Sequence, residues 1–178
     1  MRYDFEWPGL PRGYDHKYVY THPGYNLKMT DMQAAVGLAQ MGQVDDFGVA
    51  RQRNYTFLHE GLSQLQDPFL LPEPTPGSLP SWFGFPITLH GSAAGRQPEL
   101  LRFLESRHVG SRLLFGGNLV RQPYMQGRNY RVAGSLAITD TILENTFWLG
   151  VCPAVTLAML TCVVESLVEW GGRLAYDC

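Results

Sequence analysis

The sequence predicts an α+β fold, in which a short antiparallel sheet packs against helices. Three short segments, 82–89, 111–115 and 146–151, are rich in the aromatic and β-branched residues that strands favour. Between and after them, apolar residues recur at the spacing of a helix with one buried face. Short strands separated by helices bury their apolar faces against one another, as a two-layer α+β sandwich does.

The first predicted helix runs from Thr30 to Gln43. Thr30, followed three residues later by Gln33, forms a capping box that begins a helix. Small residues at positions 34, 35, 37 and 39 would let another backbone approach closely. The apolar residues at helical spacing predict one buried stripe, made of Met32, Ala35, Val36 and Ala39.

A second helix is predicted from Asp45 to Leu65 and ends at Asp67-Pro68, because the residue before a proline avoids the helical conformation. Four prolines between positions 72 and 80 then predict an extended connector. The helix has one apolar face, made of Phe47, Tyr55, Leu58, Leu62 and Leu65.

The strand 82–89 is followed by a helix that begins at Pro98 and ends near Gly110. After the strand 111–115, residues 116–134 are glycine-rich and have no apolar period, which predicts a loop that is either functional or poorly ordered. A short helix at 140–145 leads to the third strand.

The stretch from Asn145 to Val164 carries no charge over 20 residues, which is the length of a membrane-spanning helix. Pro153 lies in its middle and its first residues favour a strand. We therefore expect a strand, a turn and a last helix over 156–170, stopped by Gly171-Gly172, and no membrane span.

Composition indicates an ordinary soluble protein of the cytoplasm. The net charge of −2 gives no electrostatic reason to expect a nucleic-acid partner. The three cysteines lack metal-binding or disulfide spacing, so we expect reduced and mostly buried thiols. His16 and His22 lack nearby cysteines or paired carboxylates, and no metal site is predicted.

One continuous stretch carries a family resemblance: Gly24-Tyr25-Asn26-Leu27-Lys28-Met29-Thr30-Asp31-Met32-Gln33-Ala34-Ala35. It resembles the signature of the DegT/StrS-type nucleotide-sugar aminotransferases, which are dimeric enzymes dependent on pyridoxal phosphate. Segments 81–86, 112–119 and 121–124 look most like one branch, the CDP-4-keto-6-deoxyglucose 3-dehydrases of lipopolysaccharide dideoxysugar synthesis.

The resemblance covers roughly residues 11–170 and only the C-terminal part of such an enzyme. It implies the small C-terminal domain of the fold-type I pyridoxal-phosphate transferases. Residues 1–29 would be an irregular connector from a large domain, 30–66 interdomain helices, 67–80 a proline-rich connector and 81–178 the small domain. At 178 residues the chain is too short for both domains, so we expect a fragment or a truncated gene product.

No catalytic residue is predicted in this chain. Pyridoxal-phosphate enzymes need a Schiff-base lysine, and neither Lys17 nor Lys28 lies at the family's position. The dehydrase branch has a histidine there, which the resemblance places upstream of Met1, together with the cysteines that hold a [2Fe–2S] cluster in some of these enzymes. The polypeptide should be inactive alone.

The resemblance implies binding residues nonetheless. It places Asn26 at the cofactor phosphate of the neighbouring subunit, with Tyr25 as a weaker candidate. The alternatives are an asparagine that caps its own turn and, for Tyr25, a core or interface aromatic. Four polar residues around the glycine-rich loop could hold the diphosphate and sugar of a nucleotide sugar, or could be solvated surface groups: Arg112, Asn118, Arg121 and Gln122.

The leading hypothesis is the C-terminal portion of a 3-dehydrase that uses pyridoxal or pyridoxamine phosphate and removes the 3-hydroxyl of a CDP-hexulose. The resemblance implies a homodimer and a separate reductase. One alternative is a nucleotide-sugar aminotransferase of the same family. The other is a non-catalytic dimerisation module, supported by the small-residue first helix.

Overall fold

The computed structural model describes residues 25, 27–65, 67–125 and 127–174. The chain divides into two units, Met1–Met41 and Gly42–Cys178. The resemblance-based domain boundaries do not coincide with this division and stay a prediction.

The described part of the first unit contains helix α1, Asp31–Met41. The predicted capping box is present: the Gln33 amide nitrogen donates to Thr30 Oγ1 at 3.3 Å, and the Thr30 amide nitrogen donates to Gln33 Oε1 at 2.9 Å. The predicted buried stripe is wrong for this structure, because α1 has no buried residue and Met32 is 81% exposed. Helical spacing aligns apolar side chains, but burying them needs a second surface, which the described residues do not provide.

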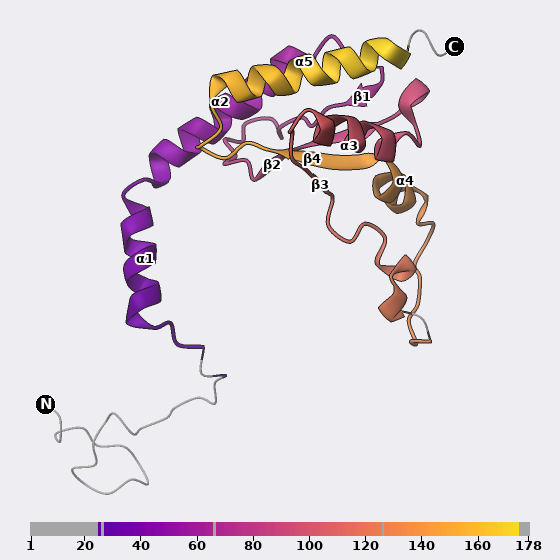
Figure 1. Ribbon diagram of the computed structural model, residues 1–178. Helices are drawn as coiled ribbons and strands as arrows, with labels where there is room; N and C mark the ends of the chain where they lie inside the picture. The colour runs from indigo at the N-terminus through magenta and orange to yellow at the C-terminus, as the bar shows by residue number, and fades with distance from the viewer. Residues whose placement is uncertain (1–24, 26, 66, 126, 175–178) are drawn as a thin grey trace, which may run out of the picture. The chain divides into compact units, whose positions relative to one another are not determined.

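The second unit is built on a four-stranded antiparallel sheet with the strand order β1-β2-β4-β3 (Figure 1). Its strands are β1 Phe69–Leu70, β2 Gly84–Leu89, β3 Ser111–Leu113 and β4 Thr146–Gly150. The three predicted strands are confirmed, although the middle one ends two residues early. The two-residue β1, too short to give a period of its own, was missed.

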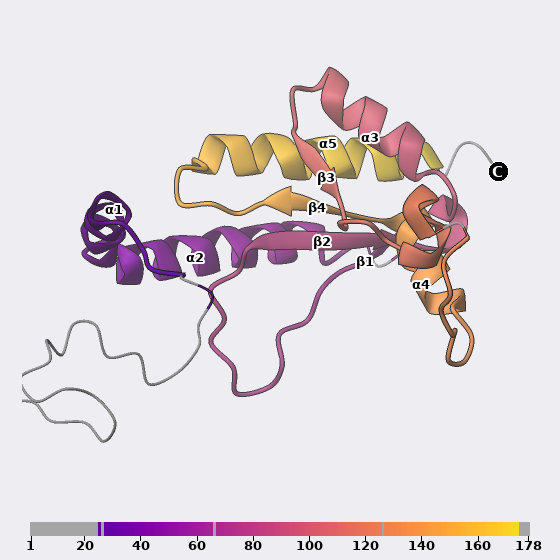
Figure 2. The ribbon, with the colours of Figure 1, turned by 90° about the horizontal axis from the view of Figure 1, so that it is seen from below.

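Three helices cover one face of this sheet: α2 Val44–Leu62, α3 Gln97–Ser106 and α5 Leu157–Leu174. Figure 1 shows α2 and α5 above the strands, and Figure 2, seen from below, shows the strands in front of them. Leu58, Leu100 and Leu160 from these helices belong to one buried cluster with strand residues. The strand residues on this face are Phe85, Ile87, Leu89, Phe147 and Leu149.

A shorter helix, α4 Ala137–Asn145, leads directly into β4. The described residues of this unit also form three 3₁₀ turns: η2 Gly91–Ala93, η3 Leu119–Arg121 and η4 Pro123–Met125. The glycine-rich segment 116–134 therefore contains two turns of helix that its sequence did not predict. Short 3₁₀ turns carry no apolar period from which to predict them.

Two further expectations are corrected. Gly171 and Gly172 do not end the last helix, which continues to Leu174; Trp170 and Leu174 on either side are buried and hold this stretch against the core. The cysteines that the structure describes, Cys152 and Cys162, are exposed rather than buried. Cys152 follows the end of β4, and Cys162 lines an open cavity beside α5, so neither belongs to the buried core.

Polar side chains of α2 fix the connector and the end of β4. Asn54 is fully buried and donates to the carbonyls of Val151 and Cys152 at 3.4 and 2.9 Å. Tyr55 donates its hydroxyl to the Pro72 carbonyl and stacks on Trp82, with ring centroids 4.1 Å apart. Burial, and secondarily the charge of Glu73, raise the pKa of Tyr55. The proline-rich connector is thus attached to α2.

Within the described residues, no helix is both long and apolar enough to cross a membrane. The uncharged stretch 145–164 forms β4, a turn and the start of α5, as predicted.

Candidate functional site

The polar residues predicted to bind a nucleotide sugar lie on β3 and on the loop that follows it. Asn118 is 3% exposed, and both ends of its amide have partners. Its Nδ2 donates to Asp140 Oδ1 at 2.6 Å, and its Oδ1 accepts from the Val120 amide nitrogen at 3.1 Å, capping η3. Asn118 therefore connects the loop to α4, and a ligand would have to replace these bonds to use it.

Arg121 lies on the same side of α4 as this connection. Its Nη2 is 2.8 Å from Asp140 Oδ2 and its Nη1 is 3.4 Å from Glu144 Oε1. The hydrogen bond from Asn118, followed by the hydrogen bond and charge of Arg121, lower the pKa of Asp140. The guanidinium is half-exposed, so it can still meet an anion, but two carboxylates already compensate its charge.

The start of the loop is closed by Gln122, whose Nε2 donates to the Gly116 carbonyl at 2.9 Å. At Gly117 the backbone has φ of +57°, and a side chain there would overlap Leu143 of α4. Only glycine allows this turn to pack directly against the helix. A groove of about 470 Å³ lies beyond it, lined by residues that include Asn118, Tyr130, Arg131 and Thr139.

Arg112 differs from these loop residues. It lies on β3 directly opposite Trp148 of β4, on the sheet face that α2, α3 and α5 leave open. Its side chain is exposed, and it forms no hydrogen bond or ion pair with another residue in the part of the chain that the structure describes. Arg112 is therefore available to an anionic ligand.

The predicted cofactor contacts lie in the first unit. Tyr25 is 92% exposed, and Asn26 lies outside the described residues, as do Lys17, His16 and His22. Lys28 is exposed. The assignments of Asn26 and Tyr25 stay predictions.

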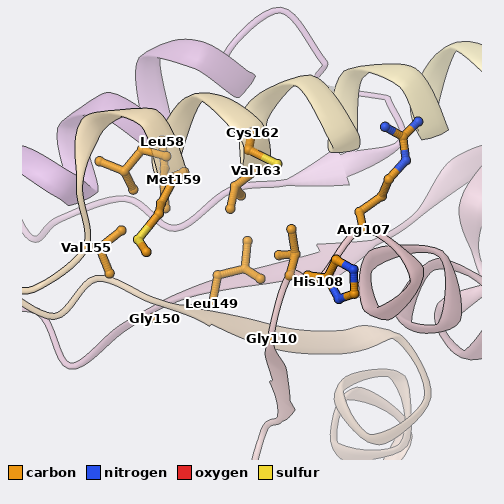
Figure 3. Close-up of a pocket in the computed structure, with 12 residues that line it drawn as sticks. Leu58, Arg107, His108, Gly110, Leu149, Gly150, Val155, Met159, Cys162 and Val163 are labelled. Carbon is orange, nitrogen blue, oxygen red and sulfur yellow. The ribbon is translucent and has the colours of Figure 1, made fainter.

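A cavity of about 390 Å³ lies between α5 and the end of β4 (Figure 3). Its walls include the apolar side chains of Leu58, Leu149, Val155 and Met159. Arg107 at its rim points toward α5 and is already paired with Glu169. An apolar cavity whose cation is neutralised does not fit a phosphorylated cofactor, which needs several hydrogen-bond donors around its phosphate.

Pyridoxal phosphate therefore has no complete site among the described residues, where the only lysine is the exposed Lys28. No group of three or more His, Cys, Asp or Glu side chains there could hold a metal ion. The described residues do offer an exposed surface, made of Arg112, the groove beside the loop after β3 and the aromatic side chains next to them.

Sequence reasoning missed those aromatic side chains. Phe83 and Phe115 are 67% and 77% exposed, and Trp148 is half-buried between them and the sheet. With Gly84, Pro86 and Leu114 they surround a shallow apolar pocket of about 210 Å³. The aromatic residues here predict strands, but composition does not tell which face of the sheet stays uncovered.

Comparison with known proteins gives a consistent result. Residues 3–168 match the model of the DegT/DnrJ/EryC1/StrS aminotransferase family. The chain is 50% identical over 163 residues, 92% of its length, to the lipopolysaccharide biosynthesis protein RfbH of Salmonella typhimurium. It is also 50% identical over 172 residues, 97% of its length, to the dTDP-4-dehydro-2,6-dideoxy-D-glucose 3-dehydratase of Saccharopolyspora spinosa.

In each case the chain spans 37% of the length of the relative. The fold is shared with a solved structure of the E. coli GDP-4-keto-6-deoxy-D-mannose-3-dehydratase with bound hydrated pyridoxal phosphate, at a TM-score of 0.73 and 20% identity. That match covers 85% of this chain and 38% of the other. The predicted α+β fold, that of a part of the aminotransferase-like enzymes, is confirmed.

Proposed function

Since this chain belongs to the DegT/DnrJ/EryC1/StrS aminotransferase family, we propose that it supplies the C-terminal part of a nucleotide-sugar 3-dehydratase. The observation that carries the proposal is the 50% identity, over 97% of the chain, to a protein named as a 3-dehydratase. The same identity to a lipopolysaccharide biosynthesis protein supports a role in making dideoxysugars of the O-antigen. Under this proposal, the described unit holds the substrate while the bond-breaking groups lie outside it.

The cofactor of the assembled enzyme is pyridoxal or pyridoxamine phosphate, which supplies an electron sink when it is bound. Its site is not complete within the described residues, so we assign no chemical step to them. Asn26 and Tyr25 are the candidates from this chain for contacts to it. A [2Fe–2S] cluster would also need ligands from elsewhere, because the described cysteines are two exposed, separate side chains.

The substrate is a nucleoside-diphosphate hexulose, of which the CDP form is the leading candidate. The unpaired guanidinium of Arg112 can form two parallel hydrogen bonds to a phosphate. Arg121 is a weaker phosphate contact because Asp140 and Glu144 already pair with it. In this arrangement, Asn118 and Gln122 act mainly by holding the loop in shape.

Homodimerisation fits helix α1, which leaves a helical surface of apolar and small residues exposed. A separate reductase would complete the deoxygenation. The same exposed helix favours the second candidate function, a non-catalytic dimerisation module. The remaining alternative is an aminotransferase of the same family. Residues outside the described part would decide between this aminotransferase and the 3-dehydratase.

The proposal is tested with a chimera in which this chain replaces the matching 37% of the Saccharopolyspora spinosa 3-dehydratase. The purified chimera is incubated with pyridoxamine phosphate, an electron-donating reductase and CDP- or dTDP-linked 4-keto sugars, and the products are weighed by mass spectrometry. We expect the chimera to replace the sugar's 3-hydroxyl by hydrogen, with two electrons from the reductase and release of water, and we expect no turnover by the 178-residue chain alone. The chimera carrying Asn118→Ala serves as a control for damage to the loop.

A chimera that folds and binds the cofactor but never dehydrates either sugar would contradict the 3-dehydratase proposal. A product that gains an amino group from glutamate would favour the aminotransferase. Size-exclusion chromatography of the chain alone, with and without pyridoxal phosphate, measures its oligomeric state and so tests the hypothesis of a dimerisation module. A cofactor-independent dimer, together with an inactive chimera, would favour it.

A further inference from the structure

The open face of the sheet carries a row of three side chains across neighbouring strands. Trp148 of β4 lies opposite Pro86 of β2 on one side and opposite Arg112 of β3 on the other. Directly opposed residues in an antiparallel sheet share a face, with Cβ atoms about 5 Å apart. The neighbouring positions, Phe85 and Leu149, point to the helix-covered face and are buried. The row therefore belongs to a surface that the helices of this unit do not cover.

The sequence places the Trp148 ring flat on this face. Gly84 has no side chain, and a Cβ there would overlap the six-membered ring of Trp148. The indole Nε1 donates to the Leu113 carbonyl at 3.1 Å, which fixes the ring's orientation along the sheet. Phe83 packs beside it, with ring centroids 4.9 Å apart. Trp148 is thus a fixed planar surface rather than a mobile side chain.

Phe115 completes the group that we call the aromatic platform, defined as Phe83, Phe115 and Trp148. Phe115 follows β3 with φ of +52°, in the left-handed region that a bulky residue rarely adopts. Its ring is 77% exposed, although it lines the same pocket as Trp148. Three exposed or half-exposed aromatic rings around one pocket form a surface on which a flat ring can stack.

The size of the pocket at the aromatic platform and the charge of Arg112 indicate which kind of ligand could bind there. The pocket, about 210 Å³, is smaller than the roughly 300 to 1,000 Å³ of sites that enclose drug-sized ligands, so it fits one ring system. Arg112, next to Trp148 in the row, is exposed and has no partner within the described residues. Arg107 and Arg121, which lie on either side of it in the sequence, are already paired with carboxylates, so the positive charge beside the platform is that of Arg112. An aromatic ring joined to an anion matches both features.

We propose that the aromatic platform binds the base of a nucleoside diphosphate by stacking, while Arg112 pairs with its phosphates. The inference rests on the proposed function for the identity of the whole substrate, and it assigns the base end of that substrate to this sheet face. The loop 116–134 begins directly after Phe115 and Gly116, so the rest of the substrate extends from the platform toward that loop. The platform residues thereby set affinity for the nucleotide and not the chemistry of the sugar.

The test is isothermal titration of the 178-residue chain with CDP, with cytidine and with inorganic pyrophosphate. We expect Phe83→Ala and Phe115→Ala each to weaken CDP binding about tenfold, because stacking on an aromatic side chain contributes that much to the binding of a base. Arg112→Gln should weaken CDP about fivefold and leave cytidine unchanged, since it removes only the charge-assisted bonds to phosphate. Leu79→Ala and Arg102→Gln, at exposed positions that do not line the platform pocket, are the matched controls and should bind like the parent chain.

Thermal unfolding by circular dichroism establishes that each variant is folded, and if Phe115→Ala is not, Phe83→Ala and Arg112→Gln still decide the question. No CDP binding by the parent chain, or equal affinity in parent and platform variants, overturns the inference. So does a chimera in which Phe83→Ala lowers thermal stability but leaves KM unchanged, because the platform would then be a contact between domains. A chimera without dehydratase activity, combined with platform-dependent CDP binding, refutes the proposed function and leaves this inference standing.

Discussion

Helices α1 and α2 follow one another in sequence, yet they are stabilised in different ways. Helix α1 begins with a complete capping box and buries none of its residues. Helix α2 has no side-chain hydrogen bond at its N-cap, Gln43, but buries Tyr55, Leu58 and Leu62 against the sheet and α5. Local hydrogen bonds determine where a helix starts, whereas burial determines whether its position in the fold is fixed.

The apolar side chains of α1 show what this difference means for function. Met32, Val36 and Leu38 are between 65% and 81% exposed. Isolated helices of about this length are marginal in water, so most of the stability of such a helix comes from packing. This surface is where we expect another part of the assembled enzyme to pack, which explains why a helix with a strong start signal carries so much unburied apolar surface.

The largest expected effect comes from the same substitution made in the two helices. Leu62→Ala in α2 removes a fully buried side chain and should lower the free energy of unfolding by about 2 to 5 kcal/mol, measured by urea denaturation. Leu38→Ala in α1 removes a side chain that is 75% exposed and should change it by less than about 0.5 kcal/mol. A loss at Leu38 as large as that at Leu62 would show that α1 is buried in solution, and the contrast between the helices would fail.

A smaller effect is expected from breaking the capping box. Thr30→Ala removes the hydroxyl that accepts from the Gln33 amide and should destabilise α1 by about 1 kcal/mol. Hydrogen exchange should then be faster at the amides of α1 and unchanged in α2, because the two belong to separate units. Gln40→Ala, at an exposed position of the same helix, is the control. Equal acceleration in both helices would contradict local stabilisation of α1.

The smallest effect concerns the loop, which like the start of α1 is held by side-chain hydrogen bonds. The pKa of Asp140 lies below its ordinary value, because Asn118 and Arg121 bond to the charged form. Its contribution to stability is therefore present above the carboxyl's unfolded pKa and is lost as the pH falls through the lowered folded pKa. Asp140→Asn should be less stable than the parent near pH 6, and this difference should shrink steadily toward pH 3.

Urea denaturation across this pH range measures that difference, with Glu144→Gln as the control, since Glu144 contacts Arg121 only at 3.4 Å. A difference between parent and Asp140→Asn that stays constant down to pH 3 would show that the link between loop and α4 does not depend on the carboxylate's charge.

Much of the fold could be predicted from sequence, because its signals are local. The strand composition of 82–89 and 146–151 predicted β2 and β4, and the apolar period after Pro153 predicted α5 within one residue at its start. The end of α5 could not be predicted, because two glycines are a local stop signal that the burial of Trp170 and Leu174 overrides. Tertiary packing contributes more free energy than a single propensity.

The candidate site, like the fold, could be predicted from the sequence only in part. Sequence selected Arg112, Asn118, Arg121 and Gln122 as a polar group, but only the tertiary structure separates their situations. Asn118 connects the loop to α4, Gln122 bonds within the loop and Arg121 is paired with α4. Arg112, beside Trp148, has no side-chain partner among the described residues.

By itself, the sequence determined the class of fold, the order of its main elements and the beginning of α1, since each depends on residues close together in the chain. The tertiary structure decided which sheet face stays open, which of the two predicted site arginines has no partner among the described residues, and which apolar residues remain exposed. These properties depend on contacts between residues far apart in the sequence, such as Gly84 beneath Trp148, and no local pattern specifies such contacts.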